Sequence, residues 1–333
     1  MRRAVIQGVM AATGDNRGKT RVLISALGWL TYEQAKPHIE KFLADESSFN
    51  RYIGIATSAI HRHDPGVHLD QALCDVYPLL IARALRAYGE LGRSIKLNPF
   101  SLRENLADYD DNIRFSTALS ATRTDNCEAI EVLKKFVVPD SPYKEKALNS
   151  ALRRMELTVA LSWQKDLADS PDTIRLAIIG AGIIGDPALV PWLMEQMRSP
   201  IFARVAGEAF TMITGIDNDL EELKGQRPEG FEAGANDDPQ DENAAMDADE
   251  NLPWPNTELI AAWWDKNKGS FQSGARLLLG KPISDNHLRH VLKTGLQRQR
   301  AAAALELAIM HPGQPLFEVR APASRQIKEL ENL

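Results

Sequence analysis

Hydrophobic positions along this chain recur at helical spacing around a repeated small-residue motif. A small residue, then Ala, then usually an apolar residue lies inside amphipathic stretches about every 30 residues. The motifs are centred on seven anchor alanines, which are Ala26, Ala59, Ala87, Ala118, Ala151, Ala181 and Ala209. Because apolar residues at i, i+3, i+4 and i+7 share one helix face, the pattern predicts a helix around each anchor.

A second amphipathic stretch follows the turn after several anchors. Residues 35–45, 127–137 and 187–197 each place apolar side chains on one face, with Pro and Asp at the turns between helices. Two short antiparallel helices cannot bury their apolar faces alone, so neighbouring pairs are expected to stack. The sequence therefore predicts an all-α fold, an α-solenoid of antiparallel helix pairs.

One of these turns contains a literal Gly-x-Gly-x-x-Gly at Gly180, Gly182 and Gly185. A dinucleotide site would need a strand before the glycines and a helix beginning within them. Asp186-Pro187 instead places the next helix start after the third glycine, and no second strand ending in an acidic residue follows. We therefore favour a helix end and a turn over a cofactor site.

The same turn carries a family resemblance. Residues 185–193, GDPALVPWL, resemble the helix-turn-helix signature of HEAT repeats, closest to the phycobilin-lyase type. The C-terminal pattern WW…F…GARLLLGKP…VLKTGLQRQRAAAALELA is similar to an uncharacterised bacterial HEAT-repeat family often encoded in type VI secretion gene clusters. The resemblance implies a fold without assigned chemistry, and it implies that Met1 begins partway into the repeats.

Charge is distributed unevenly. The formal net charge is −6, yet residues 217–250 hold thirteen acidic residues against Lys224 and Arg227, which leaves the remaining chain mildly basic. We expect a repeat region at 1–216, an acidic insertion at 217–252 and a C-terminal helical cap at 253–333. The insertion lacks apolar periodicity, so a disordered linker is favoured. Two alternative roles of the insertion remain open. It attracts a basic partner by its charge, or it covers the basic surface of its own chain.

Motifs that could carry chemistry are weak. Gly14 to Thr20 resembles a phosphate-binding loop but is one residue too short between its glycines, so a loop between helices is favoured. His61, His63, Asp64 and His68 are the densest group of potential metal ligands, with a helix end and turn as the favoured alternative. We expect His287 and His290, three residues apart, to lie on the surface of an amphipathic helix. Cys74 and Cys127 lie among apolar residues, so we expect both thiols to be buried in the core. The carboxylate pairs Asp110-Asp111 and Glu221-Glu222 are expected to be solvated charges in loops. We expect no enzyme activity, cofactor or metal.

The apolar runs, the N-terminus and the number of cysteines indicate the cellular compartment that we expect for this chain. No apolar run approaches the roughly 18 residues that span a membrane, and the basic N-terminus is followed by an apolar run interrupted at Gln7. Two cysteines make no disulfide framework, which is typical of a reducing compartment. A cytoplasmic protein without a membrane segment is expected.

A long repeat surface favours binding over catalysis. We expect a scaffold, adaptor or chaperone for another protein, which by the resemblance would be a type VI secretion effector or spike component. The alternative is a nucleic-acid-binding solenoid. Candidate partner-binding residues are Trp254, Trp263, Trp264, Arg153, Arg154, Arg298 and Arg300.

Overall fold

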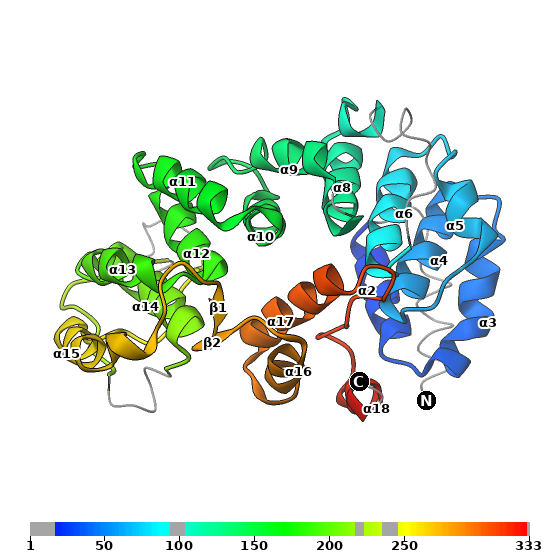
Figure 1. Ribbon diagram of the computed structural model, residues 1–333. Coiled ribbons are helices and arrows are strands. Elements are labelled where there is room, and N and C mark those ends of the chain that lie inside the picture. The colour runs from blue at the N-terminus through cyan, green and yellow to red at the C-terminus, as the bar shows by residue number, and fades with distance from the viewer. Residues whose placement is uncertain (1–16, 94–103, 125, 217–222, 235–245, 332–333) are drawn as a thin grey trace. The chain divides into compact units, whose positions relative to one another are not determined.

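The computed structural model confirms the all-α class (Figure 1). It describes residues 17–93, 104–124, 126–216, 223–234 and 246–331. Helices make up most of these residues. The exceptions in regular structure are two short antiparallel strands, β1 (Leu277–Leu278) and β2 (Lys281–Pro282), and an isolated antiparallel bridge between Lys224 and Pro255.

The chain divides into two compact units. The first unit consists of residues 1–136 and 288–333, and the second of residues 137–287. This division differs from the expected three regions. The repeats are split between the units after Phe136, and the C-terminal part of the chain contributes to both.

The first unit contains the first four anchor helices, meaning the helices that hold the anchor alanines. Its N-terminal elements are α2 (Arg17–Gly28), α3 (Tyr32–Leu43), α4 (Ser48–Ile60), α5 (Val67–Ala72), α6 (Pro78–Glu90), α8 (Asp111–Ala121), η1 (Thr122–Thr124) and α9 (Cys127–Lys134). The anchor helices α2, α4, α6 and α8 contact one another in that order. Helices α3, α5 and α9 each pack on an anchor helix, so two layers form.

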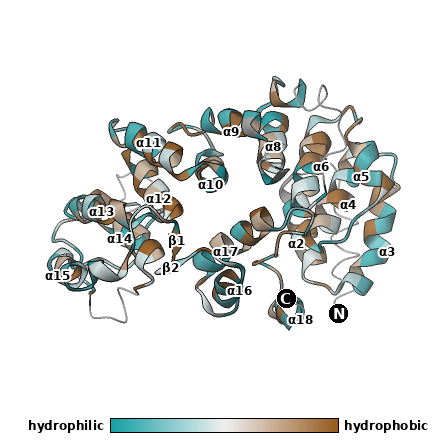
Figure 2. Ribbon diagram, in the orientation of Figure 1, coloured by the Kyte–Doolittle hydropathy of each residue, from teal (hydrophilic) through white to brown (hydrophobic). Residues whose placement is uncertain are grey.

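The second unit repeats this plan. Its elements are α10 (Lys144–Arg154), α11 (Leu157–Ala168), α12 (Ile174–Ile184), η2 (Pro187–Leu189), α13 (Val190–Gln196), α14 (Pro200–Thr214), α15 (Thr257–Asn267) and η3 (Lys268–Ser270). The anchor helices α10, α12 and α14 contact in sequence, while α11 packs on α12 and α13 on α14. Figure 2 shows α12 as largely hydrophobic, in contrast to the hydrophilic visible side of α3.

The anchor alanines lie where these helices meet. Six of the seven are at most 3% exposed, and Ala26 near the start of the described chain is the half-buried one. Small residues are needed because the backbones approach closely. A Cβ at Gly182 of α12 would lie 2.9 Å from the Cα of Ala209 in α14. The motif therefore marks helix contacts, as the sequence predicted.

The turn after α12 confirms the interpretation of the three glycines. Residues 173–179, which could have passed as a strand, belong to α12 and its N-cap. Gly185 ends α12 in the left-handed conformation, with φ 77°. The Asp186 side chain then accepts a hydrogen bond from the backbone of Ala188 and begins η2. A helix occupies the place where a dinucleotide fold needs its strand.

The C-terminal residues of the chain do more than cap one end. In the second unit, residues 274–280 cross the carboxyl ends of three anchor helices. Arg276 donates to the carbonyl of Arg153 at 2.7 Å, Leu277 N to Gly185 O at 3.0 Å, and Leu279 N to Met212 O at 2.8 Å. Carbonyls at helix ends lack intrahelical partners, so this segment satisfies them.

In the first unit another C-terminal segment has the same role. The remaining helices are α16 (Asp285–Thr294), within which the two units divide, α17 (Gln297–Met310) and α18 (Ala323–Glu331). Between α17 and α18, Leu316 N donates to Glu90 O at the end of α6 at 2.9 Å. Helix α17 contacts η1, which follows α8. The expected C-terminal cap is thus a lateral cover of helix ends.

Candidate functional site

Two of the predicted tryptophans pack in or against the apolar core of the second unit. Trp264 is 7% exposed and belongs to the main apolar cluster with Phe210 and Ile260. Trp263 meets Phe210 edge to face, with ring centroids 5.8 Å apart, and Phe271 packs on both tryptophans. Asn256 caps α15 as predicted, through a 3.1 Å bond from Leu259 N. These tryptophans attach α15 to the unit, and Trp264 offers almost no surface to a partner.

Trp254 lies in a different arrangement, around Arg204 of α14. The guanidinium carbon of Arg204 is 4.6 Å from the Trp254 ring centroid and 5.7 Å from that of Phe231. Cation–π contact of this kind is favourable where the cation is desolvated, and Arg204 is 5% exposed. Asp247 completes the site with an ion pair of 2.7 Å. The hydrogen bond from Arg204 lowers the pKa of the Asp247 carboxyl.

A second arginine–aspartate pair involves Asp249, two residues after Asp247. Arg175 of α12 donates two hydrogen bonds to Asp249, at 2.6 and 2.8 Å. Asp249 is 5% exposed, and its hydrogen bonds raise the pKa of Arg175. A bidentate pair of this geometry is the strongest kind of side-chain hydrogen bonding.

The acidic insertion is therefore packed at both described ends. Leu223 is buried in the apolar cluster, and its carbonyl accepts from Asn256 N at 2.7 Å. At the other end, Asp247 and Asp249 bind helix arginines. The prediction of a disordered insertion is wrong for these residues, because two partly buried ion pairs and one buried apolar side chain hold them. The intramolecular cover is the alternative that they fit; residues 217–222 and 235–245 lie outside the described residues.

The predicted arginines do not form one basic surface within either unit. Arg153 is 4% exposed and donates from Nε to Asn149 at 2.9 Å, so it is a packing residue of α10. Its neighbour Arg154 is half-buried. In the first unit, Arg298 is exposed, whereas Arg300 donates to Leu292 O at 2.7 Å and to the Gln326 side chain.

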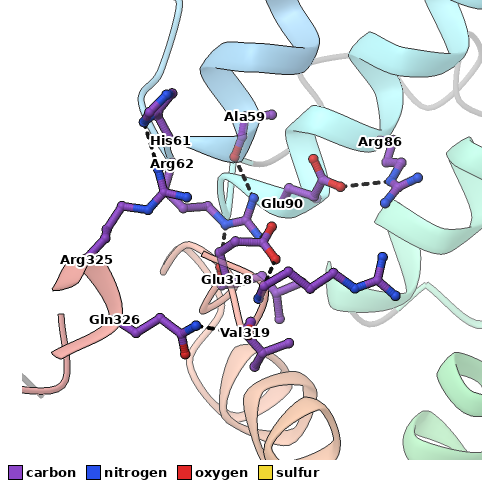
Figure 3. A network of polar contacts seen from close by, with 12 residues as sticks. Ala59, His61, Arg62, Arg86, Glu90, Glu318, Val319, Arg325 and Gln326 are labelled. Atoms are coloured by element: carbon purple, nitrogen blue, oxygen red, sulfur yellow. Dashed lines mark hydrogen bonds and ion pairs between the residues drawn. The ribbon is translucent and has the colours of Figure 1, made fainter. Parts of the chain in front are cut away.

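The first unit holds a polar network that the sequence analysis missed (Figure 3). Glu90 at the end of α6 pairs with Arg83 and Arg86, each at 2.8 Å. Burial alone would raise the pKa of Glu90, but the charges of Arg83, Arg86 and Arg62 outweigh it and lower the pKa to about 2. Three guanidinium groups around one carboxylate fix the end of α6.

The same network joins the C-terminal segment to α4. Arg62 follows α4 with a positive φ of 54° and donates to Leu316 O, Ala59 O and Glu318, the last at 3.0 Å. Arg123 after α8 donates to Gly89 O, and burial lowers the pKa of its guanidinium to about 10. These arginines donate hydrogen bonds to carbonyl oxygens at the carboxyl ends of successive anchor helices, where positive charge is favourable.

The histidine group makes no metal site in the described residues. Both ring nitrogens of His61 lie in hydrogen bonds, Nε2 to Leu27 O at 3.0 Å and Nδ1 to Arg325 at 2.8 Å. His63 stacks on Tyr32, with centroids 4.0 Å apart, and Asp64 accepts from Gly66 N and Arg93. No group of three His, Cys, Asp or Glu residues in this part of the chain is placed to hold an ion. His61 instead links α2, α4 and α18.

The structure also shows where the phosphate-loop-like segment, Cys74 and the carboxylate Asp110 lie. Residues 17–20 of the phosphate-loop-like segment belong to α2, so they are helical and not a loop. Cys74 is exposed, so the core-thiol interpretation is wrong for it. Asp110 is the N-cap of α8 rather than a free loop charge. Residues 14–16, Glu221 and Glu222 and the side chain of Cys127 lie outside the described residues.

The two histidines of α16 differ in exposure. His287 is half-buried and hydrogen-bonds Leu278 O at 2.6 Å, whereas His290 is exposed, as predicted for a surface residue. A surface cleft of about 610 Å³ lies beside α8 and α9 in the first unit, lined by Leu106, Ala107, Arg114, Glu128, Val132 and Lys135. It brings no set of catalytic groups together.

A different tryptophan is available at the surface. Trp29, directly after α2, is 68% exposed, whereas the other five tryptophans are buried or half-buried. Val22, two turns earlier in α2, is 57% exposed. Sequence reasoning missed Trp29, which lies inside the anchor motif ISALGWL, because the motif predicts a helix and does not say which of its apolar residues are buried.

The chain matches no protein-family model, no curated protein and no solved structure. The resemblance to HEAT repeats therefore rests on the residues quoted for it and on no wider match. No helix in the described ranges is long and apolar enough to cross a membrane.

Proposed function

We propose that this protein is a non-enzymatic scaffold, adaptor or chaperone that binds another protein through a HEAT-like α-solenoid. The observation that carries the proposal is the ordered stacking of anchor helices, α2 to α8 in one unit and α10 to α14 in the other. Repeats that contact mainly their neighbours build extended surfaces, and such surfaces serve binding.

The exposed aromatic residue Trp29 supplies the anchor for that partner. Tryptophan is the residue most enriched at interface hot spots, since it buries a large area with few rotatable bonds. Trp254, Trp263 and Trp264 are engaged in the packing of the second unit. We therefore move the candidate partner-binding site from these tryptophans to the surface around Trp29 and Val22.

The partner's identity follows only from the sequence resemblance. By that resemblance it would be a type VI secretion effector or spike component. A nucleic-acid partner is the alternative, but Arg153 and Arg300 already donate to protein groups, which leaves fewer arginines for phosphates.

A native pull-down tests the proposal. The tagged chain is isolated from its own cells under native conditions, and the bound polypeptides are identified by mass spectrometry. Trp29→Ala is compared with Ile201→Ala, which truncates a similarly exposed apolar residue of the second unit. We expect a reproducible partner that is lost with Trp29→Ala and retained with Ile201→Ala. A partner retained equally by both variants would move the site away from Trp29, and recovery of no protein would overturn the proposal.

A further inference from the structure

Helix α18 is held on the first unit by polar contacts rather than by apolar burial. Gln326 is its buried residue, and Ile327 is 57% exposed. The Gln326 amide nitrogen donates to Val319 O and Ala321 O of the same C-terminal segment, and its oxygen accepts from Arg300 of α17. Arg325 carries the hydrogen bond from α18 to His61 at the end of α4 (Figure 3). Because little apolar surface is buried, α18 is an element of low local stability.

The two hydrogen bonds of His61 define its protonation state. Nε2 lies 3.0 Å from Leu27 O, and a carbonyl only accepts, so Nε2 carries the proton. Nδ1 lies 2.8 Å from Nη1 of Arg325, and a guanidinium only donates, so Nδ1 must offer its lone pair. Only the neutral imidazole with the proton on Nε2 satisfies both neighbours.

We propose that the contact between His61 and Arg325 is a pH-sensitive latch, which holds α18 at neutral pH and releases it when His61 becomes protonated. A proton on Nδ1 removes the acceptor that Arg325 uses and places two positive charges at hydrogen-bond distance. Nε and Nη2 of Arg325 are buried and have no hydrogen-bond partner in the described residues. Protonation of Nδ1 therefore leaves all three guanidinium nitrogens of Arg325 without a hydrogen-bond partner among the described residues, unless Arg325 moves.

The surrounding charges set the direction of the response. Burial lowers the pKa of His61, and Arg325 and His63 lower it further, whereas the Leu27 carbonyl and Glu33 raise it. On its other side Arg325 faces Glu329, Glu318 and Arg62. The ring of Tyr32 lies edge-on to His61, with centroids 5.8 Å apart. The net result is a neutral His61 in the closed latch.

The sign of the pH dependence follows. Release of α18 removes the charge of Arg325 and part of the burial, so the released His61 has a higher pKa than the latched one, in which the pKa is lowered from 6.5. Below 6.5 the released state binds more protons, so the latch weakens as the pH falls and is fully formed above that value. Each unit of pKa difference corresponds to about a tenfold change in the opening equilibrium.

Glu329 is a neighbouring group whose titration could imitate this response. Burial raises the pKa of Glu329, so it also takes up a proton as the pH falls and weakens its attraction to Arg325. A variant that keeps both hydrogen bonds at position 61 without titrating separates the two groups. Glutamine does so, because its amide nitrogen can donate to Leu27 O and its oxygen can accept from Arg325.

Hydrogen–deuterium exchange of the full chain at pH 7.5 and pH 5.0, corrected for the intrinsic exchange rate, tests the latch. Protection of the amides at 323–331 should be lower at pH 5.0 than at pH 7.5. His61→Gln should show equal protection at both pH values, and the exposed His290→Gln should behave as the unaltered chain does. Unchanged protection in the unaltered chain, or an equal fall in His61→Gln, overturns the proposal.

A second variant keeps the test decisive if His61→Gln does not fold. Arg325→Gln leaves His61 in place and removes the positive charge beside it. The NMR titration midpoint of His61 should rise toward 6.5, and α18 should exchange rapidly at both pH values. A midpoint equal to that of the unaltered chain would overturn the latch. This outcome is independent of whether Trp29 binds a partner.

Discussion

Leu277 and Gly185 are joined by a backbone hydrogen bond of 3.0 Å, although they come from the hairpin after α15 and the end of α12. Gly185 has a φ of 77°, and a Cβ at this position would lie 2.1 Å from the carbonyl oxygen of Leu277. The glycine that completes the Gly-x-Gly-x-x-Gly motif is therefore required by a left-handed helix end and by a strand that crosses it.

Substitution of this glycine should be costly. Gly185→Ala is expected to lower the free energy of unfolding by roughly 2 kcal/mol or more, because it adds a backbone penalty to a steric clash. Gly180→Ala is the matched control. The atom nearest to a Cβ there is the flexible end of Leu152 at 3.2 Å, and alanine is the better helix former. Urea unfolding measures both. Equal effects of the two changes would contradict the assignment of Gly185 to the turn.

The packed end of the acidic insertion should contribute to stability. Asp249→Asn removes the charge from a bidentate ion pair with Arg175 and should cost roughly 1–3 kcal/mol. Glu250→Gln changes the exposed neighbouring carboxylate and should be nearly neutral. Thermal or urea unfolding distinguishes them, and removal of residues 228–250 should also destabilise the second unit. If Asp249→Asn left the free energy of unfolding unchanged, the insertion would be better described as a disordered linker.

Acid should weaken the end of α6. The folded-state pKa of Glu90, about 2, lies below its ordinary 4.5. The unfolded state therefore binds more protons between these values, so the contribution is present above 4.5 and is lost as the pH falls toward 2. Glu90→Gln should cost roughly 2–4 kcal/mol at neutral pH and flatten the stability profile in that range. Glu40→Gln, at an exposed carboxylate, should leave the profile unchanged. A profile identical in all three chains would refute this role.

The helices that carry the anchor alanines could be predicted because one local rule places them. Small residues must lie where backbones meet, and this places Ala151, Ala181 and Ala209 in register without knowledge of the partners. Gly185 followed by Asp186-Pro187 is equally local, since a left-handed helix end and an N-cap are written in adjacent residues. The all-α class and the turn at the glycines followed from these patterns.

Contacts between distant segments could not be predicted in the same way. Arg62 with Glu318, Arg175 with Asp249 and His61 with Arg325 join residues that no periodicity relates. The insertion was misjudged because its composition is that of a disordered chain, whereas two aspartates within it form ion pairs with arginines of α12 and α14. Exposure was misjudged for the same reason. Trp29 and Trp264 occupy similar apolar stretches, and only the packing of α15 against the second unit decides which is buried.

The central claim is that this chain works by holding another protein. Native mass spectrometry of the chain purified from its own cells tests it most directly. The account predicts a complex of the chain with a second polypeptide in fixed ratio, which dissociates when Trp29 is replaced by alanine. Detection of the chain alone, or of the chain bound to nucleic acid, would contradict it.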